Sequence, residues 1–293
     1  MQKKVLILGA GGMLGGAVYD VLKDKYQLVL TVRKSAEIDL LEKAYGEIAN
    51  HQVEEFDVNF IYQDYYNKKG YFGDYFSAFL KKINEVDYII NAIGITIPFS
   101  LENPLMTFFI NSAFPFILQG AFNERLIHIT TDCVYNGKEG FPYNELSPKS
   151  AVDLYGLSKS LGEPTECLTL RTSIIGREMA GFTGLLEWFL QQNGKTINGF
   201  SGHFWNGVTT KQFGKICGQI IESPDIFLKK GIYHIFSNTV SKYEMLLKLK
   251  EKYKVNCEII PEESNKLNRT LSTIYPLCGQ LKVPSFDEML KEL

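Results

Sequence analysis

The chain has 293 residues, a net charge of −2 and a hydrophobic content of 45%, which suffice for a sizeable core in one large domain or two smaller ones. The nearly balanced mixture of charges gives no broad basic field, so nucleic acid is excluded as an expected partner. The five cysteines are scattered without a CxxC pair and the four histidines are far apart, which favours a reduced protein without a structural metal.

The first apolar run begins at residue 4, so we expect no signal peptide. We also expect no apolar stretch of membrane-spanning length and no membrane partner. The expected location is therefore the cytoplasm.

Residues 4–8 (KVLIL) contain β-branched side chains in a short apolar run, which predicts a buried first strand. Three glycines at three-residue intervals follow, and residues 17–25 show helical apolar spacing. Glycine allows a tight turn and a close approach of backbone to a pyrophosphate, while the helix N-terminus offers free N–H groups. The predicted dinucleotide contacts in this turn are Gly9, Gly12, Met13, Leu14 and Gly15.

Residues 28–32 predict a second strand, and the residues after it bear on the cofactor. An NAD-binding fold usually has an acid there to accept from the ribose 2′-hydroxyl, whereas arginine suits a 2′-phosphate. Arg33 and Lys34 follow the strand, and the first acid is Glu37. The sequence therefore favours NADP(H) over NAD(H), the alternative being that both cations are solvated loop residues.

Strand and helix signals continue to alternate, as a doubly wound parallel sheet of α/β class requires. Residues 104–122 predict a long helix, apolar on more than one face, that Pro115 should kink. Such a helix is either enclosed or part of a helix–helix homodimer interface. Residues 70–74 form an aromatic, glycine-containing loop. The further strands are predicted at residues 53–56, 87–93, 126–130, 168–172 and 231–236.

The strict alternation breaks down after residue 176, which predicts a smaller lobe. Helices are predicted at residues 185–192, 242–253 and 286–293, the last begun by Ser285, and a loop at 199–206. Residues 1–175, with the strand at 231–237, form the predicted Rossmann domain. Residues 176–230 and 238–293 form the predicted substrate-binding lobe, with the cleft at the carboxyl ends of the strands.

Tyr155 and Lys159 are four residues apart, so on a helix they lie on one face, one turn apart. A phenol near its free pKa of about 10 is a poor acid–base catalyst at neutral pH. A neighbouring cation would lower that pKa, so the pair predicts a proton relay for carbonyl reduction. The same spacing also occurs on ordinary exposed helices, and the glycine turn favours the catalytic interpretation.

These motifs together resemble the extended short-chain dehydrogenase/reductases, and most closely the dTDP-4-dehydrorhamnose reductase family of nucleotide-sugar ketoreductases. The resemblance rests on the glycine turn and on residues 91–94 (NAIG), 130–135 (TTDCVY), 155–163 and 170–176 (LRTSIIG). It covers the N-terminal two thirds well and the remainder loosely. It implies a Rossmann-like fold and NADPH-dependent reduction of the 4-keto group of a nucleotide-linked deoxysugar, in the biosynthesis of surface polysaccharide.

The resemblance also implies roles for individual residues. The family has a Ser or Thr hydroxyl 24 positions before the tyrosine, and 155 − 131 = 24. Thr131 would bind the substrate carbonyl, Tyr155 would donate the proton, and Lys159 would hold the ribose, while the nicotinamide supplies the hydride. Asn111 is expected to give structural support.

Further contacts follow from the same resemblance. Asp57 and Val58 would lie near the adenine amine, although an Asp after a strand is also ordinary turn chemistry. The other implied cofactor contacts are Asn91, Ala92 and Ile93, and the implied substrate contacts are Thr96, Asp132, Cys133 and Trp205, with Phe204 and Asn206 beside Trp205.

Two related activities depend on the residues after Thr131. Nucleotide-sugar 4,6-dehydratases have an Asp-Glu pair there, and Asp132-Cys133 lacks that glutamate base. The GDP-fucose synthase family has a cysteine base at the position of Cys133, which requires a depressed thiol pKa and a histidine acid. Residues 176–188 contain no histidine. Packing is therefore favoured for Cys133, with an epimerase or epimerase-reductase as the alternative.

A third interpretation is a non-catalytic regulatory subunit that binds a dinucleotide. Such relatives tend to lose the tyrosine–lysine pair, and this chain retains Tyr155 and Lys159.

Overall fold

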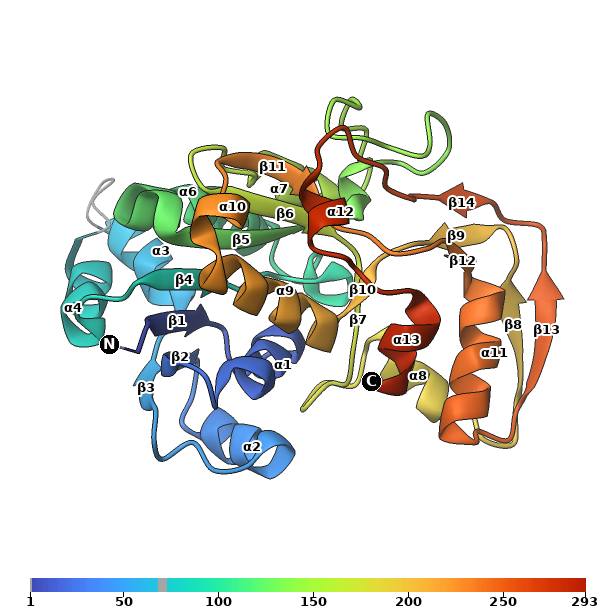
Figure 1. Cartoon of the computed structure of the whole chain (residues 1–293), viewed down its shortest axis with the longest axis horizontal. Coiled ribbons are helices and arrows are strands. Elements are labelled where there is room, and N and C mark those ends of the chain that lie inside the picture. The colour runs from blue at the N-terminus through green and yellow to red at the C-terminus, as the bar shows by residue number, and fades with distance from the viewer. Residues whose placement is uncertain (1, 68–72) are drawn as a thin grey trace.

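The computed structural model describes residues 2–67 and 73–293 (Figure 1). Its central sheet, counted over those residues, has seven parallel strands in the order β11-β6-β5-β4-β1-β2-β3, which confirms the doubly wound prediction. The strand order reverses between β1 and β4, and the crevice at this switch point is where such sheets bind ligands. The strands are β1 (Lys4–Leu8), β2 (Gln27–Val32), β3 (Gln52–Glu55), β4 (Tyr88–Asn91), β5 (Leu126–Thr131), β6 (Leu168–Thr172) and β11 (Gly231–His234).

Helices cover both faces of the sheet, which is why its inner strands β1 and β2 read as nearly continuous apolar runs. Val5 and Ile7 of β1 pack into one hydrophobic cluster, and Leu6 and Leu8 into another, because successive side chains of a strand point to opposite faces. The first cluster contains residues of α1 (Met13–Leu22), α2 (Ala36–Tyr45) and α9 (Thr210–Glu222). The second contains residues of α3 (Val58–Asn67), α4 (Gly73–Ile83) and α6 (Phe114–Phe122).

Helices α1 and α4 begin at residues that differ from the sequence prediction. Helix α1 begins at Met13 rather than residue 17, because Gly12 is its N-cap. Residues 70–72 of the predicted loop 70–74 lie outside the described residues, and Gly73 and Asp74 begin α4 rather than continue a loop.

Helix α9 lies within the stretch assigned to the substrate lobe, yet it packs against α1. Gly214 allows this approach, because a Cβ there would lie 3.1 Å from the Cβ of Val21. Helix α10 (Pro224–Phe227) follows α9, and Phe227 packs against the same cluster. The division into two domains stays a prediction, which limited proteolysis of the folded protein would test.

The long apolar helix consists of α5 (Pro104–Phe108), the π-helical turn η2 (Phe109–Ala113) and α6. The irregularity precedes Pro115, which lacks the N–H needed to continue an α-helical ladder. Residues 104–125 are long and apolar enough to cross a membrane, so the expectation that no stretch reaches this length is wrong. Phe114 and Leu118 of this helix are fully buried, as in a core helix. The homodimer through long helices stays a prediction, testable by sedimentation equilibrium.

The smaller lobe lies beyond the carboxyl ends of the strands, and Figure 1 shows it on the right. The predicted loop at 199–206 is wrong, because it contains the end of β8 and all of β9. Strand β8 pairs with β13, and β9 with β12 and β14, which are distant in sequence. The lobe contains α8 (Leu185–Leu190), β8 (Thr196–Phe200), β9 (His203–Trp205), β12 (Val240–Ser241), α11 (Lys242–Tyr253), β13 (Glu258–Glu262), β14 (Leu267–Asn268) and α13 (Phe286–Lys291).

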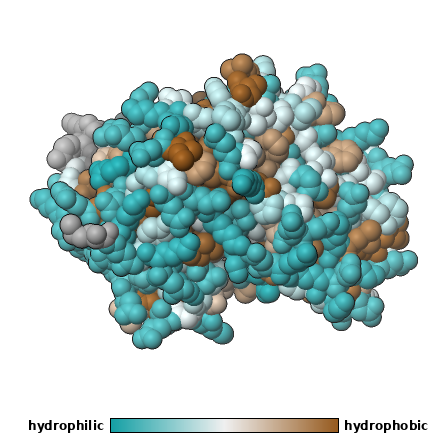
Figure 2. All heavy atoms as spheres, viewed as in Figure 1, coloured by the Kyte–Doolittle hydropathy of each residue, from teal (hydrophilic) through white to brown (hydrophobic). Residues whose placement is uncertain are grey.

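Two short strands, β7 (Ile174–Ile175) and β10 (Val208–Thr209), pair with each other, and α12 (Leu277–Gln280) precedes α13. A capping box of Ser285 and Glu288 begins α13, as the sequence predicted for Ser285. Figure 2, seen from the same side as Figure 1, shows a mostly hydrophilic surface with apolar residues in small separate groups.

Candidate active site

The glycine turn is tightly constrained. Gly9 has a φ of +80°, and a Cβ on Gly15 would lie 2.1 Å from the carbonyl oxygen of Gly9. The Thr31 hydroxyl accepts from the Gly9 N–H at 2.8 Å and fixes the turn. Gly12 has no side chain to cap α1, which leaves the first N–H groups of that helix available to a phosphate.

The end of β2 holds an ion pair that sequence analysis did not foresee. The Arg33 side chain is 73% exposed, and its Nε lies 3.3 Å from Oε1 of Glu37. The Arg33 N–H donates to Oε2 of Glu37 at 2.9 Å. A Cβ on Gly11 would lie 2.3 Å from the same Oε2, so the Glu37 carboxylate reaches the glycine turn. Lys34 is exposed.

The Asp57 side chain accepts hydrogen bonds at the start of α3. Its carboxylate accepts from the backbone N–H of Asn59 at 2.9 Å and from its side-chain amide at 3.2 Å. Val58, the next residue, is buried. These hydrogen bonds are those of an ordinary turn, the alternative role given above for Asp57. Its contact with adenine stays a prediction.

A second turn, after β4, lies against the glycine turn. The Asn91 side chain accepts from the Ile93 N–H at 3.1 Å and contacts Nδ1 of His128 at 3.1 Å. A Cβ on Gly9 would lie 2.9 Å from Cγ1 of Ile93. The structure thus brings together the turns containing Gly9 and Asn91, with Ala92 between Asn91 and Ile93, at the switch point. Thr96 is exposed further along this loop, before η1 (Ile97–Phe99).

Helix α7 (Leu154–Leu161) carries the tyrosine and lysine, and it is fixed at its beginning. Asp153 is its N-cap and accepts from the Gly156 N–H at 2.7 Å. Asn111 of η2 accepts from the Ile95 N–H at 2.9 Å and donates to the Ser158 hydroxyl at 3.1 Å. Asn111 therefore joins α7 to the loop after β4, a position suited to structural support.

Thr131 and Tyr155 lie together at the end of β5. The Thr131 hydroxyl donates to Asp132 and accepts from the Cys133 N–H, both at 3.1 Å. Burial raises the pKa of Tyr155 and a hydrogen bond with Thr131 opposes this. The expectation of a lowered phenol pKa is therefore wrong, because loss of solvation outweighs the favourable contacts of the phenolate.

Lys159 is a buried cation without a bound partner. It is 6% exposed, and a Cβ on Gly94 would lie 2.8 Å from its Nζ. Among residues 2–67 and 73–293, Nζ makes no hydrogen bond or close ion pair. Burial lowers the pKa of Lys159 to about 8, and the charge of Glu163 opposes this shift. A buried ammonium suits a ribose diol, whose hydroxyls would replace the lost water.

We expect cofactor binding to weaken as pH rises through about 8, the lowered pKa of Lys159, because the ammonium form supplies the charged hydrogen bonds. The Kd of NADPH measured from pH 6 to 10 checks this. Lys159→Arg, whose guanidinium stays charged over this range, should lose the alkaline limb. A limb that persists in this variant would exclude Lys159 as its source.

Asp132 and Cys133 follow Thr131 and lie near Arg269, a residue that the sequence analysis missed. Arg269, after β14, donates to Sγ of Cys133 at 3.3 Å and to the carbonyl of Tyr135 at 2.9 Å. Burial, with a smaller contribution from Asp132, raises the pKa of the Cys133 thiol to about 12. Burial also raises the pKa of the Asp132 carboxyl. The thiol therefore stays protonated at neutral pH.

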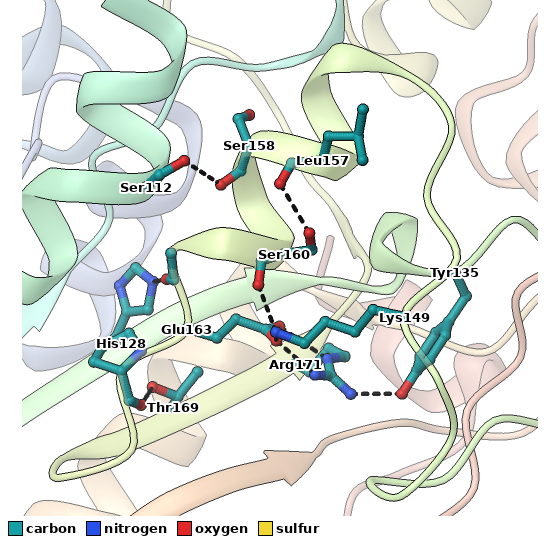
Figure 3. A network of polar contacts seen from close by, with 12 residues as sticks. Ser112, His128, Tyr135, Lys149, Leu157, Ser158, Ser160, Glu163, Thr169 and Arg171 are labelled. Atoms are coloured by element: carbon teal, nitrogen blue, oxygen red, sulfur yellow. Dashed lines mark hydrogen bonds and ion pairs between the residues drawn. The ribbon is translucent and has the colours of Figure 1, made fainter.

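A buried ion pair holds the end of α7 to β6 (Figure 3). Arg171 donates to both carboxylate oxygens of Glu163, at 2.9 and 2.7 Å. Lys149 lies 2.9 Å from the same carboxylate, and Arg171 also donates to Nε2 of His234 at 2.8 Å. This network fixes the orientation of the helix that bears the candidate catalytic pair.

The three predicted lobe residues, Phe204, Trp205 and Asn206, line two different hollows. Trp205 lines a cavity of about 80 Å³ that also contacts Met13 of the glycine turn. Phe204 and Asn206 line a different hollow with Phe236, because neighbouring residues of a strand point to opposite sides. Trp205 therefore borders the cavity beside the cofactor turn.

A doubly wound sheet with a glycine turn at its switch point and a Thr131–Tyr155–Lys159 group beside it defines a Rossmann-type protein of the extended short-chain dehydrogenase/reductase class. Residues 5–172 match the NAD dependent epimerase/dehydratase family, and residues 104–273 match the RmlD substrate binding domain. The chain therefore belongs to the NAD-dependent epimerase/dehydratase family and carries an RmlD substrate binding domain.

Known proteins agree with this assignment. The chain is 25% identical over 260 residues to the spore coat polysaccharide biosynthesis protein SpsK of Bacillus subtilis, covering 85% of this chain and 78% of that protein. Its fold is similar to that of a Bacillus anthracis dTDP-4-dehydrorhamnose reductase in complex with NADP (TM-score 0.71, 17% identity, 100% and 98% of the two chains). It is also similar to that of a UDP-N-acetylglucosamine 4-epimerase from Methanobrevibacter ruminantium (TM-score 0.73, 13% identity, 99% and 96%).

Proposed function

We propose that this protein uses NADPH to reduce the 4-keto group of a nucleotide-linked deoxysugar, in the cytoplasm, for polysaccharide biosynthesis. The observation that carries the proposal is that Tyr155 lies beside Thr131, and that the buried Lys159 of the same helix lies beside Gly94, in the loop that packs against the glycine turn. The similar proteins named for dTDP-4-dehydrorhamnose reduction and for spore coat polysaccharide support the substrate class.

The residues present fit the cofactor. The open amides at the start of α1 suit its pyrophosphate, and Lys159 suits the ribose beside the nicotinamide. The nicotinamide, when bound, supplies the hydride. The hydrogen bond to the substrate carbonyl and the proton both come from side chains of this chain.

In this mechanism the Thr131 hydroxyl turns from Asp132 to the substrate carbonyl oxygen. Tyr155 donates its proton to that oxygen as the alcohol forms. The raised pKa of Tyr155 keeps the phenol protonated at neutral pH, which is the form that a reductase needs before the proton transfer. The Lys159 ammonium then offsets the charge left on the phenolate.

The experiment that tests the proposal is NADPH oxidation by the purified protein with a small panel of nucleotide-linked 4-keto-6-deoxysugars. Oxidation with at least one member, and an alcohol at carbon 4 of the product, would support it. Tight NADPH binding without turnover of any panel member would contradict it and favour the non-catalytic regulatory subunit.

Arg33→Ala is expected to weaken NADPH binding roughly ten- to a hundredfold and to leave NADH binding nearly unchanged. A charge-assisted contact with a 2′-phosphate contributes about 1.5–3 kcal/mol, and 1.4 kcal/mol is tenfold in affinity. The Arg33 side chain is exposed, so binding a phosphate would cost it the ion pair with Glu37 and little else within residues 2–67 and 73–293. Titration of both cofactors checks this, and equal loss for both would show that Arg33 does not read the phosphate.

The epimerase-reductase alternative requires Cys133 to act as a thiolate base. Its thiol pKa, raised to about 12, favours the packing role instead. Cys133→Ser is therefore expected to keep most activity, and product formed in D₂O should carry no deuterium on carbons next to the ketone. Mass spectrometry of both products checks this, using substrate free of prior exchange. Deuterium uptake by the wild type that disappears in Cys133→Ser would place the protein with the epimerase-reductases.

A further inference from the structure

The cavity of about 80 Å³ beside Trp205 contains one charged side chain, that of Lys242, among its lining residues. Met13 of the glycine turn and Ser173, after β6, border the same cavity. It therefore lies between the cofactor turn and the lobe. The group formed by Thr131, Tyr155 and Lys159 makes no use of Lys242.

The Lys242 ammonium is not satisfied by its own helix or by a carboxylate. Ser241 and Glu244 form a capping box at the start of α11, so the backbone groups there have partners already. Nζ of Lys242 lies 5.7 Å from the centre of the Trp205 ring. Among the described residues it makes no hydrogen bond and no ion pair within 4 Å.

The acidic groups near Lys242 do not give it a hydrogen-bonding acceptor within the part of the chain that the structure describes. Burial lowers the pKa of Lys242, and Asp132 and Cys133 oppose that shift. The Asp132 carboxyl is itself buried and binds the Thr131 hydroxyl, so it is committed to the catalytic loop. A partly buried cation without a hydrogen-bonding acceptor is costly, and an anionic ligand would remove that cost.

We propose that Lys242 is a specificity-determining residue, whose ammonium binds an anionic group of the substrate in the cavity between Met13 and Trp205. The inference rests on the proposed function and names the part of the substrate that the lobe reads. The anion has two sources, a phosphate of the nucleotide carrier or a carboxylate on the sugar.

The experiment uses Lys242→Met, which keeps an apolar stem over Trp205 and removes the charge. Calorimetry would measure the Kd of dTDP, UDP, thymidine and NADPH for the wild type and the variant. We expect roughly a tenfold or greater loss for the diphosphates and little change for thymidine and NADPH. Lys250→Met, on the same helix, is the matched control and should behave as the wild type.

A second arm distinguishes the two sources. If the diphosphates bind equally to wild type and Lys242→Met, UDP-glucuronate is compared with UDP-glucose. Preference of the wild type for the glucuronate that is lost in the variant would support the proposal with a carboxylate as the anion.

Two results would overturn the proposal: unchanged binding in both arms, or a loss for NADPH equal to that for the diphosphates. A wild type that binds none of the nucleotides would instead contradict the proposed function itself, and this inference with it.

Discussion

Tyr155→Phe is expected to lower turnover by about 10²-fold or more, the usual effect of removing a general acid, while the fold and cofactor binding are kept. In the proposed mechanism the phenol is the proton donor; it lies beside Thr131, and burial raises its pKa and so keeps it protonated. Phenylalanine preserves the ring and its packing but has no proton to give, so the loss should fall on kcat rather than on the Kd of NADPH.

Steady-state kinetics with NADPH and the best substrate of the panel would measure the effect, with circular dichroism as a check of folding. Tyr275→Phe removes a hydroxyl from a half-exposed ring far along the chain and is the matched control. Wild-type rates in Tyr155→Phe would remove this residue from the mechanism.

The central sheet was predictable because its strands are buried on both faces. Residues 4–8 read as an apolar run, and the structure has a strand with these same bounds. The strand predicted at residues 168–172 also has the bounds of β6. Strands β8 and β9 were missed because their parallel partners β13 and β14 follow in the chain only after residue 257. Pairing of that kind is not visible in a local pattern.

The site was predictable where it depends on local spacing. Tyr155 and Lys159 occupy one helix, and Thr131 ends the neighbouring strand β5. The direction of the Tyr155 pKa was not predictable, since the loss of solvation that raises it arises from tertiary packing. Arg269 and Lys242 were missed because they reach the site from the lobe, where neither motif nor periodicity marks them.

Arg171→Met is expected to lower the free energy of unfolding by about 3–5 kcal/mol, the range for breaking a buried ion pair by removal of one partner. Arg171 is 1% exposed, and the Glu163 side chain that it binds is fully buried. The variant would leave that carboxylate with Lys149 alone, a residue whose side chain is 40% exposed and therefore well hydrated.

Guanidinium denaturation of wild type, Arg171→Met and the double variant Arg171→Met/Glu163→Met would measure the effect. The double variant should recover much of the loss, because two apolar side chains can replace a buried pair at little cost once neither charge is left alone. The cost of the single variant thus comes from the stranded Glu163 carboxylate rather than from the net strength of the pair. A single variant within about 1 kcal/mol of the wild type would show instead that Lys149 compensates that carboxylate, since exposed pairs contribute up to about that much.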